Sequence, residues 1–193
     1  RANGRFGIDL ETTSLDPLEG KIRLVQLAVS DKNAVTDAAG NPANDAGCKV
    51  FISDCFTLGQ QEIIGPLAEL LADPDVTVVG HNLKFDLAFI RRAVGRRLEM
   101  QNLFDTMLAS QLNFAGYHKL ERSEQATKHT LKEAYPHHSL ADLVQRHLGL
   151  ILDKTEQTGD WNGKLTQAQI QYAAKDAAVL LPLYEIQATL LKK

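Results

Sequence analysis

The sequence predicts a single α/β domain in which a central sheet is flanked by helices. Three observations favour this class. Short segments typical of strands come first in the chain, and segments with capping residues and apolar side chains at helical spacing follow them. The 193 residues are also enough for one hydrophobic core. We therefore expect residues 1–193 to form one domain, and the start at Arg1 without Met suggests that it is part of a longer protein.

Four strands are expected, and the first three are close together in the chain. Residues 6–13 (FGIDLETT) predict the first strand, and residues 22–29 alternate weakly and predict the second. A long turn at 38–47, rich in Gly, Pro, Asn and Asp, separates them from a third strand at 49–52. The simplest arrangement of these three is an antiparallel meander. Residues 76–79 predict a buried fourth strand, which we expect to lie beside the first.

Helices are indicated by the residues at their ends. Residues 61–72 predict a helix that stops before Asp73-Pro74, and a Gly-Asn turn after the fourth strand starts another. Three more are expected at capping residues: a helix after Asp105, a helix from Ser139 to Gly149, and a last helix after the capping box of Thr166 and Gln169. Asp105 is also an acid that could bind a metal ion, and we prefer the capping role.

The last helix carries two further signals. Pro182 lacks a backbone donor and crowds the preceding turn, so we expect a bend there. An apolar stripe is expected to face the core and to leave Tyr172 and Asp176 on another face. The stripe consists of Ile170, Ala174, Ala177, Leu181 and Tyr184.

Four carboxylates at three separated places in the chain are its most informative feature. Asp9 and Glu11 share one face of the first strand, Asp86 lies in the first turns of a helix, and Asp176 follows Tyr172 by one helical turn. Each acid lies in or beside an apolar segment, where an unpaired charge is costly, so a shared site requires neutralising cations. Oxygen ligands without thiolates or a histidine pair suit Mg²⁺ or Mn²⁺ better than Zn²⁺. The pattern therefore predicts a metal site.

Three segments carry a resemblance to a known superfamily. DLETTSLDP at 9–17, GHNLKFD at 80–86 and YAAKD at 172–176 resemble the three exonuclease motifs of the DEDD superfamily, in its tyrosine-bearing DEDDy branch. The first two are most similar to the proofreading domain of family A DNA polymerases. The segment at 138–161 is more similar to ribonuclease D and to RecQ-type helicase exonucleases. The resemblance covers most of the chain and implies a three-layer ribonuclease H-like fold, in which parallel strands extend the meander into a mixed sheet flanked by helices.

The resemblance also implies a reaction and the residues that perform it. The expected activity is metal-dependent 3′–5′ exonuclease hydrolysis of phosphodiester bonds, which releases nucleoside 5′-monophosphates. Two divalent cations, Mg²⁺ or Mn²⁺, would be held by Asp9, Glu11, Asp86 and Asp176, with Asp9 bridging both. Tyr172 would orient the attacking water, since its ordinary pKa of about 10 makes it a poor base alone.

Substrate contacts follow from the same motifs. We expect contacts to the terminal nucleotide from Thr12, Leu15, Asn82 and Lys84, and a cleft wall that includes Gln157 and Trp161. DNA with a single-stranded or mismatched 3′ end is the expected substrate. The alternatives are an exoribonuclease similar to ribonuclease D and a nucleic-acid-binding domain of the same fold without catalysis. The second alternative is disfavoured because none of the acids is missing.

Composition adds constraints on partners and compartment. A formal net charge of −3 is low for a protein that binds nucleic acid, but bound cations would cancel part of the acidic charge. No apolar stretch is long enough to span a membrane, and no signal peptide is visible. The two cysteines do not form a disulfide framework. We expect a cytoplasmic or nucleoid-associated protein, organellar if eukaryotic and not secreted, with a fused or associated polymerase domain as a further partner.

Overall fold

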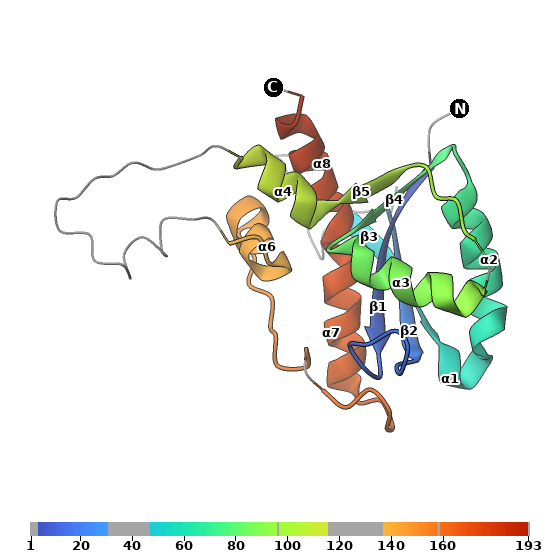
Figure 1. The fold of residues 1–193 in the computed structure, drawn as a ribbon. Helices are drawn as coiled ribbons and strands as arrows, with labels where there is room; N and C mark the ends of the chain where they lie inside the picture. The colour runs from blue at the N-terminus through green and yellow to red at the C-terminus, as the bar shows by residue number, and fades with distance from the viewer. Residues whose placement is uncertain (1–3, 31–46, 96, 116–136, 158, 193) are drawn as a thin grey trace.

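The computed structural model describes residues 4–30, 47–95, 97–115, 137–157 and 159–192, which form a three-layer α/β domain (Figure 1). Its centre is a five-stranded mixed sheet with the order β3-β2-β1-β4-β5. The first three strands pair antiparallel, and β4 and β5 continue the sheet parallel to β1. The strands are β1 (Gly4–Thr12), β2 (Ile22–Ser30), β3 (Cys48–Asp54), β4 (Val76–Gly80) and β5 (Leu103–Asp105). The predicted meander and the predicted parallel neighbour of the first strand are both confirmed.

Helices cover both faces of this sheet. On one face lie α2 and α3, and on the other lie α7 and α8, with α4 and α6 packed against α8 (Figure 1). The helices are α1 (Cys55–Leu58), α2 (Gln60–Ala72), α3 (Leu83–Val94), α4 (Thr106–Asn113), α6 (Leu140–Leu148), α7 (Gln167–Ala178) and α8 (Leu180–Leu190). Within the described ranges, no helix is long and apolar enough to cross a membrane.

The two faces of β1 have different roles, as its alternation predicts. Phe6, Ile8 and Leu10 are buried in the main core cluster together with residues of α2 and α3. The opposite face carries Gly7, Asp9 and Glu11. A Cβ atom at Gly7 would lie 3.1 Å from the Cβ of Leu180, so the absence of a side chain there lets α8 approach the sheet closely. One face of this strand therefore builds the core, and the other is left for the acidic side chains.

Two features differ from the sequence-based expectation. The strand β5 has only three residues, which is too short for a period-two pattern to reveal it. The last helix is broken at Val179 into α7 and α8, and Pro182 lies in the first turn of α8, where a missing N–H costs nothing. The helix is thus interrupted three residues before Pro182, where the bend was expected. The predicted turn at 38–47 lies outside the described residues, except for Gly47.

The predicted apolar stripe is confirmed at Ala177 and Leu181 but is wrong by one position at Ala174. The buried residues of this helix near its centre are Ala173 and Ala177, whereas Ala174 is only half-buried. The two alanines let the helix lie close on β1, β2 and β3. Ala173 lies one helical turn before Ala177 and therefore shares its face, whereas Ala174 lies to the side of that face.

Candidate active site

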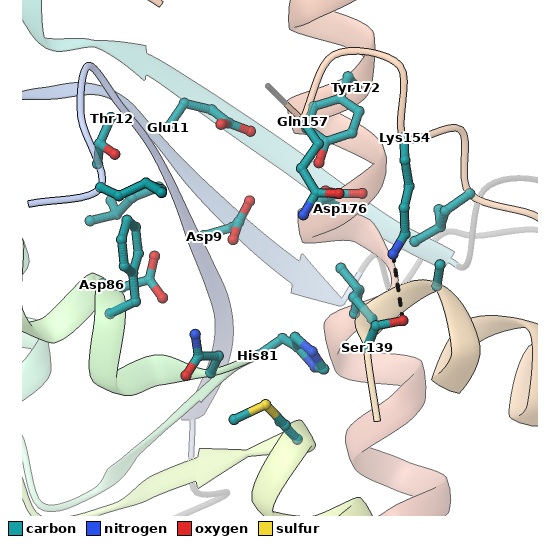
Figure 2. A pocket seen from close by; sticks show the side chains of 18 of the residues that line it. Asp9, Glu11, Thr12, His81, Asp86, Ser139, Lys154, Gln157, Tyr172 and Asp176 are labelled. Atoms are coloured by element: carbon teal, nitrogen blue, oxygen red, sulfur yellow. Dashed lines mark hydrogen bonds between the residues drawn. The ribbon is translucent and has the colours of Figure 1, made fainter. Parts of the chain in front are cut away.

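The four predicted carboxylates line one cavity of about 360 Å³ at one end of the sheet. Asp9 and Glu11 project from β1, Asp86 from α3 and Asp176 from α7. Figure 2 shows these side chains around a single opening, with Tyr172 beside Asp176. Three elements far apart in the chain are therefore brought together as the sequence predicts.

The first turn of α3 is anchored by Asp105, which holds Asp86 in place. The carboxylate of Asp105 accepts hydrogen bonds from the backbone N–H groups of Asn82 and Leu83, at 3.0 and 2.9 Å. It also caps α4 by accepting from the N–H of Met107 at 2.9 Å, so the predicted capping role is present and extends to a second helix. Asn82 has a left-handed backbone with φ 56°, a strained conformation that is often found at functional sites.

The acids lie in a poorly solvated environment, and this shifts their pKa values upward. Burial, followed by the charges of neighbouring acids, raises the pKa of Asp9 well above its ordinary value and that of Glu11 to about 8. Burial also raises the pKa of Asp86 to about 8, although the N–H of Leu10, which hydrogen-bonds both Asp9 and Asp86, opposes the shift. For Asp176 burial raises the pKa to about 6. The cluster favours protons or cations over free negative charge.

Tyr172 is positioned by Asp176 and by an aromatic neighbour. Its hydroxyl donates a hydrogen bond to the Asp176 carboxylate, one helical turn further along α7. The Tyr172 ring lies 6.4 Å from the Trp161 ring, centroid to centroid. Burial and the nearby acids raise the pKa of Tyr172 above its ordinary value. Tyr172 is therefore suited to donating a hydrogen bond and poorly suited to acting as a base.

The opposite wall contains polar residues that the sequence analysis missed. Lys154 lines the cavity, and its Nζ lies 3.5 Å from the Oγ of Ser139, on the other side of the opening from Asp86 (Figure 2). His81 also lines the cavity, and its Nδ1 lies 2.9 Å from the Thr106 hydroxyl, which itself donates to the carbonyl of Gly80. Burial lowers the pKa of His81 to about 4, so it is neutral at physiological pH.

The predicted substrate contacts divide into two groups. Thr12, Leu15 and Asn82 line the cavity, as do Gln157 and Trp161. Lys84 does not line this cavity: it lines a separate apolar depression near β5 and α4, so its contact to substrate stays a prediction. The reason is geometric, since residues two apart on a helix point in nearly opposite directions, and Asp86 already faces the cavity. The lysine that does line the cavity is Lys154, which lies outside the three motifs in sequence.

Comparison with known proteins identifies the family of this chain. The model of the 3′–5′ exonuclease family matches residues 1–192. The chain belongs to the 3′–5′ exonuclease family. Its fold agrees, because solved nucleases of ribonuclease H-like fold superpose on it. The resemblance drawn from the three motifs is therefore confirmed at the level of the family.

The names of the relatives of this exonuclease domain refer to different nucleic acids, DNA in some and RNA in others. It is 32% identical over 178 residues to DNA polymerase I of Aquifex aeolicus, which covers 92% of this chain and 22% of that protein. It is 28% identical over 177 residues to ribonuclease D of Desulfotalea psychrophila, which covers 90% of this chain and 36% of that protein. The chain thus spans less than two thirds of the length of either relative.

A solved structure supports the same assignment of the exonuclease domain. Brucella melitensis NrnC bound to pGG superposes with a TM-score of 0.66 at 26% identity, covering 97% of this chain and 73% of that chain.

The donor set of the exonuclease domain fits a hard divalent cation. Four carboxylates share the cavity with Tyr172, and cysteine does not line it. As the side chains stand, no group of three described Asp, Glu, His or Cys residues could hold one ion. A bound cation would offset the mutual repulsion that contributes to the raised pKa values of Asp9 and Glu11.

The raised pKa values predict a pH dependence of folding stability without metal. The folded state holds protons on Glu11 and Asp86 up to about pH 8 and on Asp176 up to about pH 6, whereas the unfolded chain releases them near pH 4. This stabilisation is complete below pH 4 and is lost as the pH rises to 8. We expect the melting temperature in EDTA to fall from pH 5 to pH 8, and Mg²⁺ to restore it at pH 8. An unchanged melting temperature across this range would contradict the shifts.

Proposed function

We propose that this domain hydrolyses the terminal phosphodiester bond of DNA from the 3′ end, with two divalent cations, Mg²⁺ or Mn²⁺, and releases nucleoside 5′-monophosphates. The observation that carries the proposal is the gathering of four buried carboxylates from β1, α3 and α7 around one cavity, with Tyr172 hydrogen-bonded to one of them. The family membership supplies the reaction class.

Each acid has a role that follows from its place. Asp9, at the centre of the cluster in Figure 2, would bridge two cations. Glu11 and Asp176 would complete the coordination of one cation, and Asp86 would coordinate the other. When bound, the cations lower the pKa of the attacking water and stabilise charge on the attacking and leaving oxygens. The water loses a proton as its oxygen bonds to phosphorus, and the bond from phosphorus to the 3′ oxygen breaks. The departing 3′ oxygen takes up a proton, which leaves a new 3′-hydroxyl end.

The protein side chains position the reactants around this centre. Tyr172 orients the attacking water through its hydroxyl, which Asp176 holds in place. Leu15 is 85% exposed at the rim of the cavity, where a leucine can pack against a base. Thr12 and Asn82 lie within reach of the terminal nucleotide, since both line the cavity. Lys154 faces the acids from the opposite wall and would bind a phosphate of the substrate.

The preference for DNA is supported by the motifs at 9–17 and 80–86, which resemble those of polymerase proofreading domains, and by the 32% identity to DNA polymerase I over 92% of this chain. The ribonuclease D relatives are 28–36% identical over 62–90% of the chain, so identity alone does not decide the substrate. The deciding measurement is kcat/KM on single-stranded DNA and RNA of identical sequence, where we expect DNA to be preferred. Paired 3′ ends should be slower than mismatched ends by about tenfold, because separating the last pair costs about 1.4 kcal/mol. Equal rates on paired and mismatched ends would contradict a single-strand preference.

An exoribonuclease remains the second candidate, and specific observations favour it. Ribonuclease D matches 90% of this chain, and the solved relative in complex with pGG is 26% identical. The catalytic groups would be the same in both cases, so only the contacts to the sugar and bases differ. A clear preference for RNA in the same kinetic comparison would replace the DNA proposal with this one and would leave the reaction class unchanged.

Lys154→Ala tests the substrate contact on the opposite wall. Removing the ammonium that faces the substrate should raise KM several-fold with a smaller change in kcat. It should also reduce the slope of log KM against log salt concentration by about one, the value for one lost phosphate contact. Lys84→Ala is the matched control, since Lys84 lines another depression and should leave both quantities unchanged. If Lys84→Ala raises KM and Lys154→Ala does not, the original sequence-based contact was right.

A further inference from the structure

Gln26 lies in the centre of the sheet, directly beside the catalytic cavity. It is on β2, where its cross-strand partners are Asp9 on β1 and Ile52 on β3. Paired residues of neighbouring strands point to the same face, so Gln26 and Asp9 share a face. Leu24, two residues before on that face, packs against Trp161 and Ala173, so α7 covers it. Gln26 is therefore enclosed between the strand that carries Asp9 and the helix that carries Asp176.

The amide of Gln26 is buried without hydrogen bonds. Its side chain is 0% exposed, and neither Nε2 nor Oε1 has a hydrogen-bond partner in the described part of the chain. Burying such a group without a partner destabilises the fold, so natural proteins rarely keep one without a use. A leucine or methionine of similar volume would avoid this cost. The position therefore needs an explanation beyond packing.

The surroundings of Gln26 indicate which group its amide serves. Its same-face neighbours on β2 are Leu24 and Ala28, and its partner on β3 is Ile52, all of them apolar. The other cross-strand partner is Asp9, whose carboxylate lies on the same face. Side chains directly opposite in an antiparallel pair have Cβ atoms about 5 Å apart, so a glutamine amide can reach the carboxylate of its partner by a change of side-chain torsion.

We propose that Gln26 is a positioning residue for Asp9: its Nε2 donates a hydrogen bond to the Asp9 carboxylate when that carboxylate turns to hold a divalent cation. The inference rests on the proposed function, since it assigns Asp9 to the cation. A carboxylate that binds a cation with one oxygen has its other oxygen free to accept, and a donor there fixes its orientation. The unpaired amide is thus the cost of keeping this donor ready before the cation binds.

Gln26→Met tests the proposal because it keeps length and burial but removes the amide. Removal of a side chain that hydrogen-bonds a metal ligand typically lowers metal affinity or activity by about 10–100-fold. We therefore expect Gln26→Met to lower the Mg²⁺ affinity, measured by isothermal titration calorimetry, by about tenfold or more. The value of kcat should fall, while KM for a single-stranded oligonucleotide stays the same. The melting temperature in EDTA should equal or exceed that of the wild type. Unchanged Mg²⁺ affinity and kcat would overturn the proposal.

Gln187→Met is the matched control. Gln187 is also fully buried with an unpaired Oε1, but its Nε2 donates to the carbonyl of Thr106 and it lies on α8 outside the cavity. Its replacement should leave Mg²⁺ affinity unchanged even if it lowers stability. A wild-type domain that binds no Mg²⁺ would instead contradict the proposed function. The two failures are therefore distinguishable.

A second measurement needs no substitution. In nitrogen-15 NMR spectra of the wild-type domain, the side-chain amide of Gln26 can be assigned through its own covalent bonds. Addition of Mg²⁺ should shift this amide and slow the rotation of its NH₂ group, because one hydrogen becomes engaged with Asp9. The amide of Gln187 should not respond. A Gln26 amide that is unchanged at saturating Mg²⁺ would overturn the proposal even if Gln26→Met failed to fold.

Discussion

Asp9→Asn is expected to lower kcat/KM by roughly a thousandfold or more. Loss of the carboxylate that we propose bridges the two cations would remove stabilisation of the transition state worth several kcal/mol, and each 1.4 kcal/mol is about tenfold in rate. The same change should raise the melting temperature in EDTA, because Asp9 is a buried acid whose pKa is raised by burial and by Asp86, Glu11 and Asp176. Measurement of both quantities separates a lost active site from a lost fold.

Asp16→Asn is the control for this variant. Asp16 belongs to the same motif, is exposed on the loop after β1 and does not line the cavity. Its Oδ1 accepts from the N–H of Leu18 at 2.8 Å, a role that an asparagine oxygen can fill. Full activity of the Asp9→Asn variant in the presence of Mg²⁺ would contradict a cation site at these acids. Full activity of the wild-type protein in EDTA would contradict it as well.

Tyr172→Phe is expected to lower kcat by roughly a hundredfold while KM for the oligonucleotide is unchanged. The hydroxyl is proposed to orient water only as the reaction proceeds, and loss of an interaction made in the transition state lowers kcat without weakening substrate binding. The phenyl ring should keep its contact with Trp161, so the fold is retained. The hydrogen bond from Tyr172 lowers the pKa of Asp176, so in metal-free protein this pKa should rise further in the variant.

Tyr184→Phe provides the comparison. Tyr184 lies on α8, where its ring packs edge-on against Phe104 with centroids 4.7 Å apart, outside the cavity. Its replacement should leave kcat and KM unchanged. If Tyr172→Phe raises KM and leaves kcat intact, Tyr172 is a substrate-binding residue and another group must position the water.

The acids were predictable because their signals are local and physical. Alternation in β1 places Asp9 and Glu11 opposite Phe6, Ile8 and Leu10, and these core residues are indeed buried together. Burial of a charged carboxylate beside an apolar segment destabilises any fold in which it is unpaired, so its presence indicates a functional site before the fold is known. The resemblance to exonuclease motifs then joins the three segments.

What the sequence could not reveal depends on contacts between distant residues. Asp105 was correctly expected to cap α4, but its bonds to Asn82 and Leu83 join residues more than twenty positions apart. Lys84 was placed by its nearness to Asp86 in sequence, whereas helix geometry sends it elsewhere. Lys154 comes from a segment without periodic pattern, so only the folded chain brings it to the cavity.

The packing of α7 on the sheet has a consequence for how this domain can change in evolution. Ala173 and Ala177 are fully buried, so two methyl groups set the distance between Asp176 and the acids of β1. A valine at either position would act as a wedge that widens the gap and separates the carboxylates. Substitutions at residues that do not contact the nucleotide can therefore lower or abolish activity. Evolution toward a non-catalytic relative could begin with the replacement of one of these alanines, while all four acids are still present.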